Sequence, residues 1–92
     1  MTKVAHETYT ELKDRADQKA RFKKVQKALA HLQANPRHPG LQSHKYESMQ
    51  GANGEAVWDS YVENNTPSAW RIFWHYGPGK GVLTVLMITP HP

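Results

Sequence analysis

The sequence predicts an α+β fold in which an N-terminal helical hairpin packs on a four-stranded, mainly antiparallel twisted sheet. The first third of the chain carries apolar side chains at helical spacing, whereas the second half carries β-branched and aromatic runs separated by short polar or glycine-rich links. Because the helices come first and the strands second, the two kinds of element are expected to form separate layers. At 92 residues, we expect a single domain over residues 1–92.

Two helices are expected, over residues 6–17 and 18–34. The first has a modest apolar pattern and contains neither glycine nor proline. The second is stronger and should end at Asn35-Pro36, since proline disfavours helical geometry in the residue before it. Its apolar stripe contains Phe22, Val25, Leu29 and Leu32.

Four strands are expected, over residues 41–49, 57–63, 69–76 and 82–89, joined by polar or glycine-rich loops that include residues 64–68. Alternation along the third strand divides its side chains between two faces. The more apolar set should meet the helices, so Arg71 is expected to project from the opposite, more open face. The apolar set is Trp70, Ile72, Trp74 and Tyr76, and the other set is Arg71, Phe73 and His75.

Composition excludes several classes of protein. No stretch of about 18 apolar residues is present, which argues against a membrane span. The first residues form no hydrophobic signal region and cysteine is absent, so we expect a cytoplasmic chain. The six histidines show no metal-ligand spacing, and no phosphate loop or nucleophile elbow occurs. We therefore expect neither a metal nor a cofactor.

Positive charge is concentrated in the first half of the chain. Residues 1–45 carry ten of the twelve Lys and Arg residues but only four of the eight acids. Such a surface either attracts an anionic partner or simply keeps a small protein in solution. The candidate RNA- or partner-binding residues are Lys23, Lys24, Lys27, Arg37 and His44.

A few residues of the strands indicate metal-free RNA cleavage by the neighbouring 2′-hydroxyl, which needs a base, an acid and a cation. Arg71 can supply the cation, and His91 can act as acid or base because imidazole titrates near neutral pH. Lys45, on the first strand beside His44, is expected to approach the same face. Each also has an ordinary explanation: Arg71 could bridge an acid such as Glu63, and His91 could be a terminal side chain in solvent.

Five blocks of the sequence, in this order, resemble the RelE/ParE superfamily of bacterial toxins. The match runs from about residue 12 to the C-terminus and implies an α+β fold with the active residues on the sheet. It also implies a cognate antitoxin as partner and, for the RelE-like branch, cleavage of mRNA on the ribosome. The blocks are Asn35-Pro36-Arg37-His38-Pro39-Gly40-Leu41, His44-Lys45-Tyr46, Val57-Trp58, Trp70-Arg71-Ile72-Phe73-Trp74 and Ile88-Thr89-Pro90-His91.

The resemblance assigns catalytic roles to three residues. Arg71 matches the family's strand arginine, His91 its near-terminal histidine and Lys45 a common first-strand lysine. The chain departs from the pattern of the nucleases at Gln42, where one branch has a glutamate base, along Asp59-Ser60-Tyr61, which is often arginine-rich, and at Pro92. These departures leave two alternatives: a ParE-like inhibitor of DNA gyrase, and a catalytically degenerate binding protein on the same scaffold.

Overall fold

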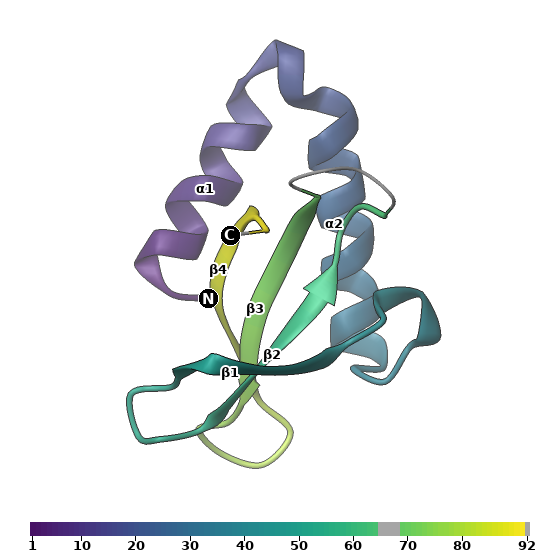
Figure 1. The fold of residues 1–92 in the computed structure, drawn as a ribbon. Coiled ribbons are helices and arrows are strands. Elements are labelled where there is room, and N and C mark those ends of the chain that lie inside the picture. The colour runs from purple at the N-terminus through teal and green to yellow at the C-terminus, as the bar shows by residue number, and fades with distance from the viewer. Residues whose placement is uncertain (65–68, 92) are drawn as a thin grey trace.

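The computed structural model, which describes residues 1–64 and 69–91, confirms the α+β fold (Figure 1). Two helices precede a four-stranded antiparallel sheet with strand order β1-β2-β3-β4. The elements are α1 (Lys3–Asp14), a 3₁₀ turn (Ala16–Gln18), α2 (Lys19–Ala34), a second 3₁₀ turn (Pro39–Leu41), β1 (His44–Gln50), β2 (Ala56–Tyr61), β3 (Trp70–Tyr76) and β4 (Leu83–Pro90).

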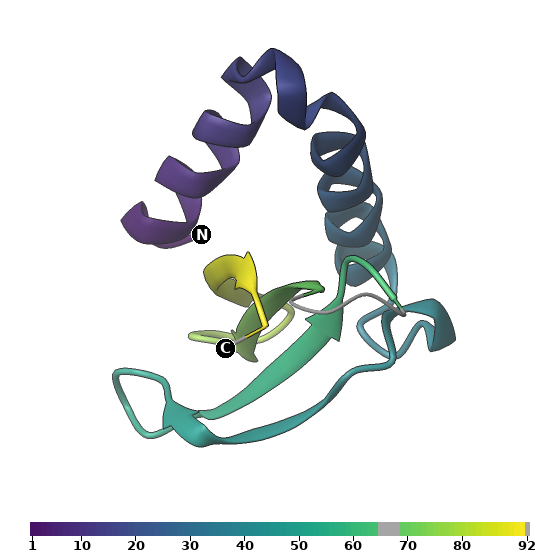
Figure 2. The same ribbon diagram turned by 45° about the horizontal axis from the view of Figure 1, so that its top comes forward.

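The two helices lie over one face of the sheet, as Figure 2 shows. Helix α1 begins three residues earlier than expected because Thr2 caps it, its hydroxyl accepting the backbone N–H of Ala5 at 3.2 Å. The same hydroxyl donates to the carbonyl of Leu86 at 2.7 Å. One threonine therefore both starts the helix and ties it to β4.

Strand β1 begins three residues later than expected. Residues 39–41 form the second 3₁₀ turn instead, and Gln42 leaves this turn in the left-handed region at φ 45°. The other three strands agree with the predicted ranges to within two residues. Most of the predicted loop over residues 64–68 lies outside the described residues, as does Pro92.

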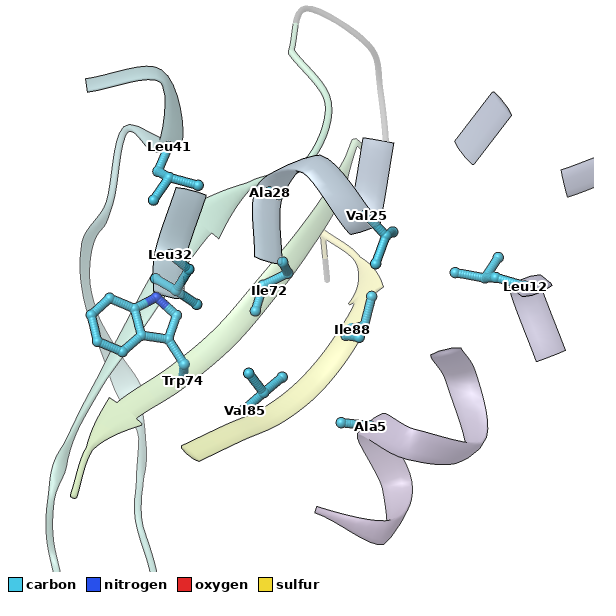
Figure 3. Packing of buried hydrophobic residues seen from close by; sticks show 10 residues of the cluster. All are labelled: Ala5, Leu12, Val25, Ala28, Leu32, Leu41, Ile72, Trp74, Val85 and Ile88. Atoms are coloured by element: carbon cyan, nitrogen blue, oxygen red, sulfur yellow. The ribbon is translucent and has the colours of Figure 1, made fainter. Parts of the chain in front are cut away.

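The core lies between the helices and the sheet (Figure 3). Ile72 and Trp74 of β3 are buried against α2, which confirms the predicted apolar face of that strand. Tyr76, at the end of this face, is 48% exposed. The cluster contains Ala5, Leu12, Val25, Ala28, Leu32, Leu41, Ile72, Trp74, Val85 and Ile88.

The opposite face of β3 is also covered in part, because the twisted sheet brings β1 across it. The ring of Tyr46, on β1, packs edge-on against Phe73 with 4.9 Å between centroids. Phe73 and His75 are 0% and 4% exposed. This second covered face contains the polar residues of the candidate site.

Candidate active site

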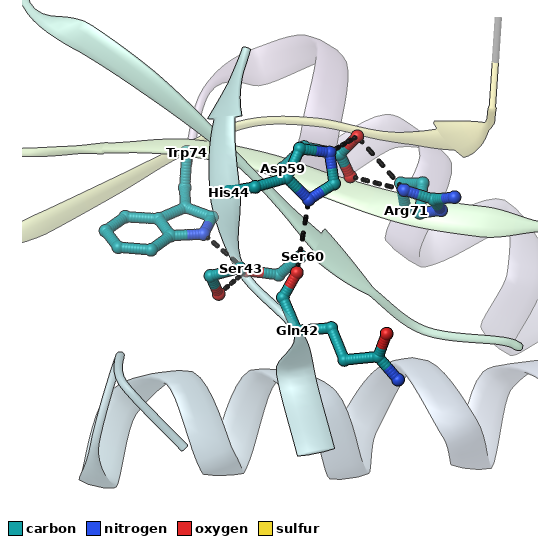
Figure 4. A network of polar contacts seen from close by, with 7 residues as sticks. All are labelled: Gln42, Ser43, His44, Asp59, Ser60, Arg71 and Trp74. Carbon is teal, nitrogen blue, oxygen red and sulfur yellow. Dashed lines mark hydrogen bonds and ion pairs between the residues drawn. The ribbon is translucent and has the colours of Figure 1, made fainter. Parts of the chain in front are cut away.

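A buried ion pair joins β2 to β3 on the face opposite the helices (Figure 4). The Nη1 atom of Arg71 lies 3.2 and 3.1 Å from the two carboxylate oxygens of Asp59. Arg71 is 8% exposed and Asp59 is fully buried. The expectation that Arg71 projects away from the helices is therefore correct, but the expectation that its face is open is wrong.

Glu63, the acid that the sequence suggested for Arg71, has other partners. Its Oε2 lies 3.5 Å from Nε of Arg21 and 3.8 Å from Nζ of Lys24. Its other oxygen accepts the backbone N–H of Trp70 at 3.2 Å. The regular strand ends at Tyr61, the register partner of Arg71. Val62 and Glu63 then both donate their backbone N–H to the carbonyl of Trp70, which breaks the alternation that would have placed Glu63 with Asp59.

Arg71 retains hydrogen-bonding capacity beyond this pair. Its guanidinium carbon lies 3.6 Å from the ring centroid of Tyr61, a cation–π contact that covers one side of the cation. Its Nε is buried and has no hydrogen-bond partner within the described part of the chain. A buried donor without a partner carries a desolvation cost, and no ligand reaches this atom while its neighbours keep these positions.

His44 adds an imidazole to the same cluster. It is the first residue of β1 and pairs in register with Asp59. Its Nε2 lies 3.3 Å from Oδ2 of Asp59, and its Nδ1 lies 3.2 Å from the carbonyl of Gln42. Carbonyl and carboxylate oxygens only accept hydrogen bonds, so both contacts are satisfied together when the ring carries two protons. His44 is half exposed and can therefore exchange a proton with a ligand.

His91 lies on the other side of Arg71 along the sheet. Its backbone N–H donates to the carbonyl of Ala69 at 2.8 Å, which extends the β3–β4 ladder past Pro90. Because Thr89 pairs with Arg71, alternation assigns His91 to the face of Arg71. His91 is exposed, and Arg71 therefore lies between the sheet positions of two solvent-accessible histidines.

Lys45 does not join this cluster. It pairs in register with Trp58, whose ring stacks on Trp74 of the helix-covered face. The Nζ atom of Lys45 lies 3.8 Å from the carboxylate of Glu47. The expectation that Lys45 approaches the face of Arg71 is wrong, because the strand begins at His44 and alternation turns the next residue away.

Ser60, one of the departures from the nuclease pattern, supports the core. The indole N–H of Trp74 donates to its hydroxyl at 2.7 Å, and this hydroxyl lies 2.6 Å from that of Ser43. The chain of bonds satisfies a buried indole and links β2 to the segment before β1. Gln42, another departure, contacts Asn64 at 3.5 Å and lies outside the ion-pair cluster.

The predicted binding lysines are exposed on α2. Lys24 and Lys27 line a cavity between this helix and the end of β2, whereas Lys23 lines none of the described cavities. Arg37 is exposed and lines a separate cavity of about 350 Å³ that also includes Trp58 and Tyr76. The candidate basic surface is therefore divided between two places.

Asp59 and Tyr61 are the site residues that the sequence reasoning missed. Both belong to the segment that was counted as a departure from the family. The available signal was their two-residue spacing in a strand predicted next to that of Arg71, which places an acid and an aromatic ring on one face.

Comparisons with known proteins do not assign this chain to a family. No family model, curated protein or solved structure matches this chain. Within residues 1–64 and 69–91, no group of three or more His, Asp or Glu side chains lies close enough together to hold a metal ion. No helix within these residues is long and apolar enough to cross a membrane.

Proposed function

We propose that this chain is a toxin of the RelE-like branch of the RelE/ParE superfamily. In this proposal it acts in the cytoplasm, cleaves mRNA on the ribosome without a metal or cofactor, and is neutralised by a cognate antitoxin. The five sequence blocks support the family, and the order of two helices before a four-stranded antiparallel sheet agrees with it. The observation that carries the chemistry is the placement of Arg71 between His44 and His91 on one sheet face.

The reaction needs one proton removed and one supplied. His91 is the general base that takes the proton of the 2′-hydroxyl, whose oxygen then attacks the adjacent phosphorus. His44, whose two ring nitrogens lie near the Asp59 carboxylate and the Gln42 carbonyl, is the general acid that, in its protonated form, gives a proton to the departing 5′-oxygen. A 2′,3′-cyclic phosphate and a free 5′-hydroxyl result. Arg71, whose side chain is 9% exposed, stabilises the charge that develops on a phosphate oxygen.

The test uses purified protein added to translating ribosomes. We expect new mRNA 5′-ends at the ribosomal A site, carrying 5′-hydroxyl groups, and none on the same mRNA without ribosomes. Intact mRNA after incubation with folded protein would refute the nuclease. Protein treated with EDTA and returned to EDTA-free buffer before it is added to the ribosomes should cleave at the untreated rate, since no step uses a metal held by the protein.

One observation favours a second candidate. Asp59 neutralises Arg71 inside the sheet, which reduces the positive potential available to a phosphate. A binding protein on the same scaffold, such as a ParE-like inhibitor of DNA gyrase, needs no such potential. A gyrase supercoiling assay separates the two, because the proposed nuclease should leave supercoiling unaffected.

A further inference from the structure

A second cluster of positive groups lies beside the candidate active site, in a cavity of about 380 Å³. The cavity is formed by the middle of α2, the connector around the second 3₁₀ turn, and the end of β2. Its lining residues are Lys24, Lys27, Ala28, His31, His38, Gly40, Leu41, Tyr61, Val62, Glu63 and Asn64.

The charges of this cavity do not cancel. Its lining holds one acid, Glu63, whose carboxylate already contacts Arg21 and Lys24 and accepts a backbone N–H. Within the described part of the chain, no carboxylate lies within ion-pair distance of Lys27 or His31. The remaining potential is positive and favours an anion.

The two histidines of the cavity are held in a defined arrangement. The rings of His31 and His38 stack with 4.0 Å between centroids and 25° between planes. Nδ1 of His38 accepts the backbone N–H of Gly40 at 3.0 Å, so the proton of the neutral ring is on Nε2. The stack thus keeps an N–H donor available beside Lys27.

Tyr61 connects the cavity to the ion pair. It lines the cavity and its ring also packs against the guanidinium of Arg71, 3.6 Å from the centroid. The cavity and the candidate active site therefore lie on two sides of one side chain. An RNA strand whose scissile phosphate reached Arg71 would bring a neighbouring phosphate to the lysines.

We infer that this cavity binds a backbone phosphate of single-stranded RNA, adjacent to the phosphate that is cleaved. The inference rests on the proposed function for the identity of the ligand. Lys24 and Lys27 supply charge, and His38, whose ring is positioned by its stack on His31, supplies an N–H donor. Recognition of this kind is independent of base sequence and depends strongly on salt.

Binding of a fluorescein-labelled 2′-O-methyl uridine decamer, followed by anisotropy across a salt series, tests the inference. This oligonucleotide has backbone phosphates but no 2′-hydroxyl to attack. Lys27→Ala and His31→Gln should each weaken binding about two- to tenfold. Lys27→Ala should also lower the salt slope by about 0.7, the value for one phosphate contact on a single strand. Lys19→Ala, which removes an exposed lysine elsewhere on α2, is the matched control and should change the affinity far less.

Three results would overturn the inference. The first is unchanged affinity for the decamer in Lys27→Ala and His31→Gln, and the second is an equal loss of affinity in the control Lys19→Ala. The third is tighter binding of a deca-glutamate peptide than of the decamer, with the same sensitivity to Lys27→Ala. The last result would assign the cavity to an acidic protein segment. The proposed function fails separately. If the protein binds the decamer as predicted but leaves mRNA on the ribosome intact, the inferred phosphate site stands and the proposed nuclease function is refuted. If the protein cleaves mRNA on the ribosome but Lys27→Ala and His31→Gln bind the decamer as tightly as the wild type, only the inferred phosphate site is refuted.

Discussion

The two faces of the sheet are both covered, but with different chemistry. Towards the helices, β3 buries Ile72 and Trp74 among apolar side chains, and the indole N–H of Trp74 is bonded to the hydroxyl of Ser60. Away from the helices, it buries Arg71 beside Asp59 and His75 beside Glu55. The first face follows the ordinary rule for a core, whereas the second places charges where apolar side chains would fit.

This difference indicates what each face is for. Apolar burial stabilises roughly in proportion to area, while a buried ion pair often contributes no more than well-packed apolar residues would. The helix-covered face therefore accounts for most of the stability. The polar face, which places a buried ion pair next to the exposed His44 and His91, is where the proposed function locates the chemistry.

The largest expected effect comes from breaking the ion pair on one side only. Asp59→Ala leaves the cation of Arg71 buried without a carboxylate and should cost about 3–5 kcal/mol in unfolding free energy. The double variant Asp59→Leu/Arg71→Met should recover most of that loss and abolish any RNA cleavage. Urea unfolding of the two variants measures both. A double variant as unstable as Asp59→Ala would make the pair a structural element and remove the contrast between the faces.

Shortening a side chain on the helix-covered face should lower the unfolding free energy slightly less than Asp59→Ala does. Ile72→Ala removes a fully buried side chain and should destabilise the fold by about 2–4 kcal/mol. Val82→Ala, at a position that is 46% exposed, is the control and should stay within about 0.5 kcal/mol. Equal losses at the two positions in urea unfolding would contradict the assignment of the core.

The smallest effect concerns the loop that borders the polar face. Backbone N–H groups of Glu55 itself and of Asn53 hold the pKa of the Glu55 carboxyl below its usual value. Because the folded-state pKa is lowered, this carboxylate stabilises the fold above its unfolded pKa of about 4.3, and the contribution disappears as pH falls through the folded pKa. Thermal unfolding from pH 6 to pH 3 should therefore decline less steeply in Glu55→Gln than in the wild type. Glu47 is an exposed carboxylate of the same hairpin, so Glu47→Gln measures the effect of losing a charge alone. An equal change in the pH dependence of thermal unfolding in Glu47→Gln would contradict the prediction.

The sequence was sufficient to predict the helices and strands but not all of the contacts between them. The spacing of Val25 and Leu32, and the alternation around Ile72, follow directly from helical and strand periods. The position of Lys45 required the left-handed Gln42, which delays the strand and sets its register. The burial of Arg71 required knowing that β1 crosses the second face, a consequence of sheet twist that no local pattern contains.

The candidate site was predictable to a similar degree. Arg71 and His91 were proposed because a charged or titratable residue stands out at a strand or strand end. Asp59 was missed because its partner is twelve residues away and becomes visible only when β2 and β3 are paired in register. His44 was expected to bind RNA, and its contact with Asp59 is what makes it the proposed acid.

The rate of mRNA cleavage on translating ribosomes by His44→Gln, measured together with its thermal midpoint, tests most directly whether the polar face performs chemistry. Glutamine retains hydrogen-bonding groups but cannot transfer a proton. We predict a cleavage rate lower by about 10²–10⁴-fold, with a midpoint within about 3 °C of the wild type, because Asp59 remains paired with Arg71. His6→Gln, an exposed histidine of α1, should cleave at the wild-type rate. Wild-type cleavage by His44→Gln would contradict the account, and so would a loss of activity that only follows a loss of folding.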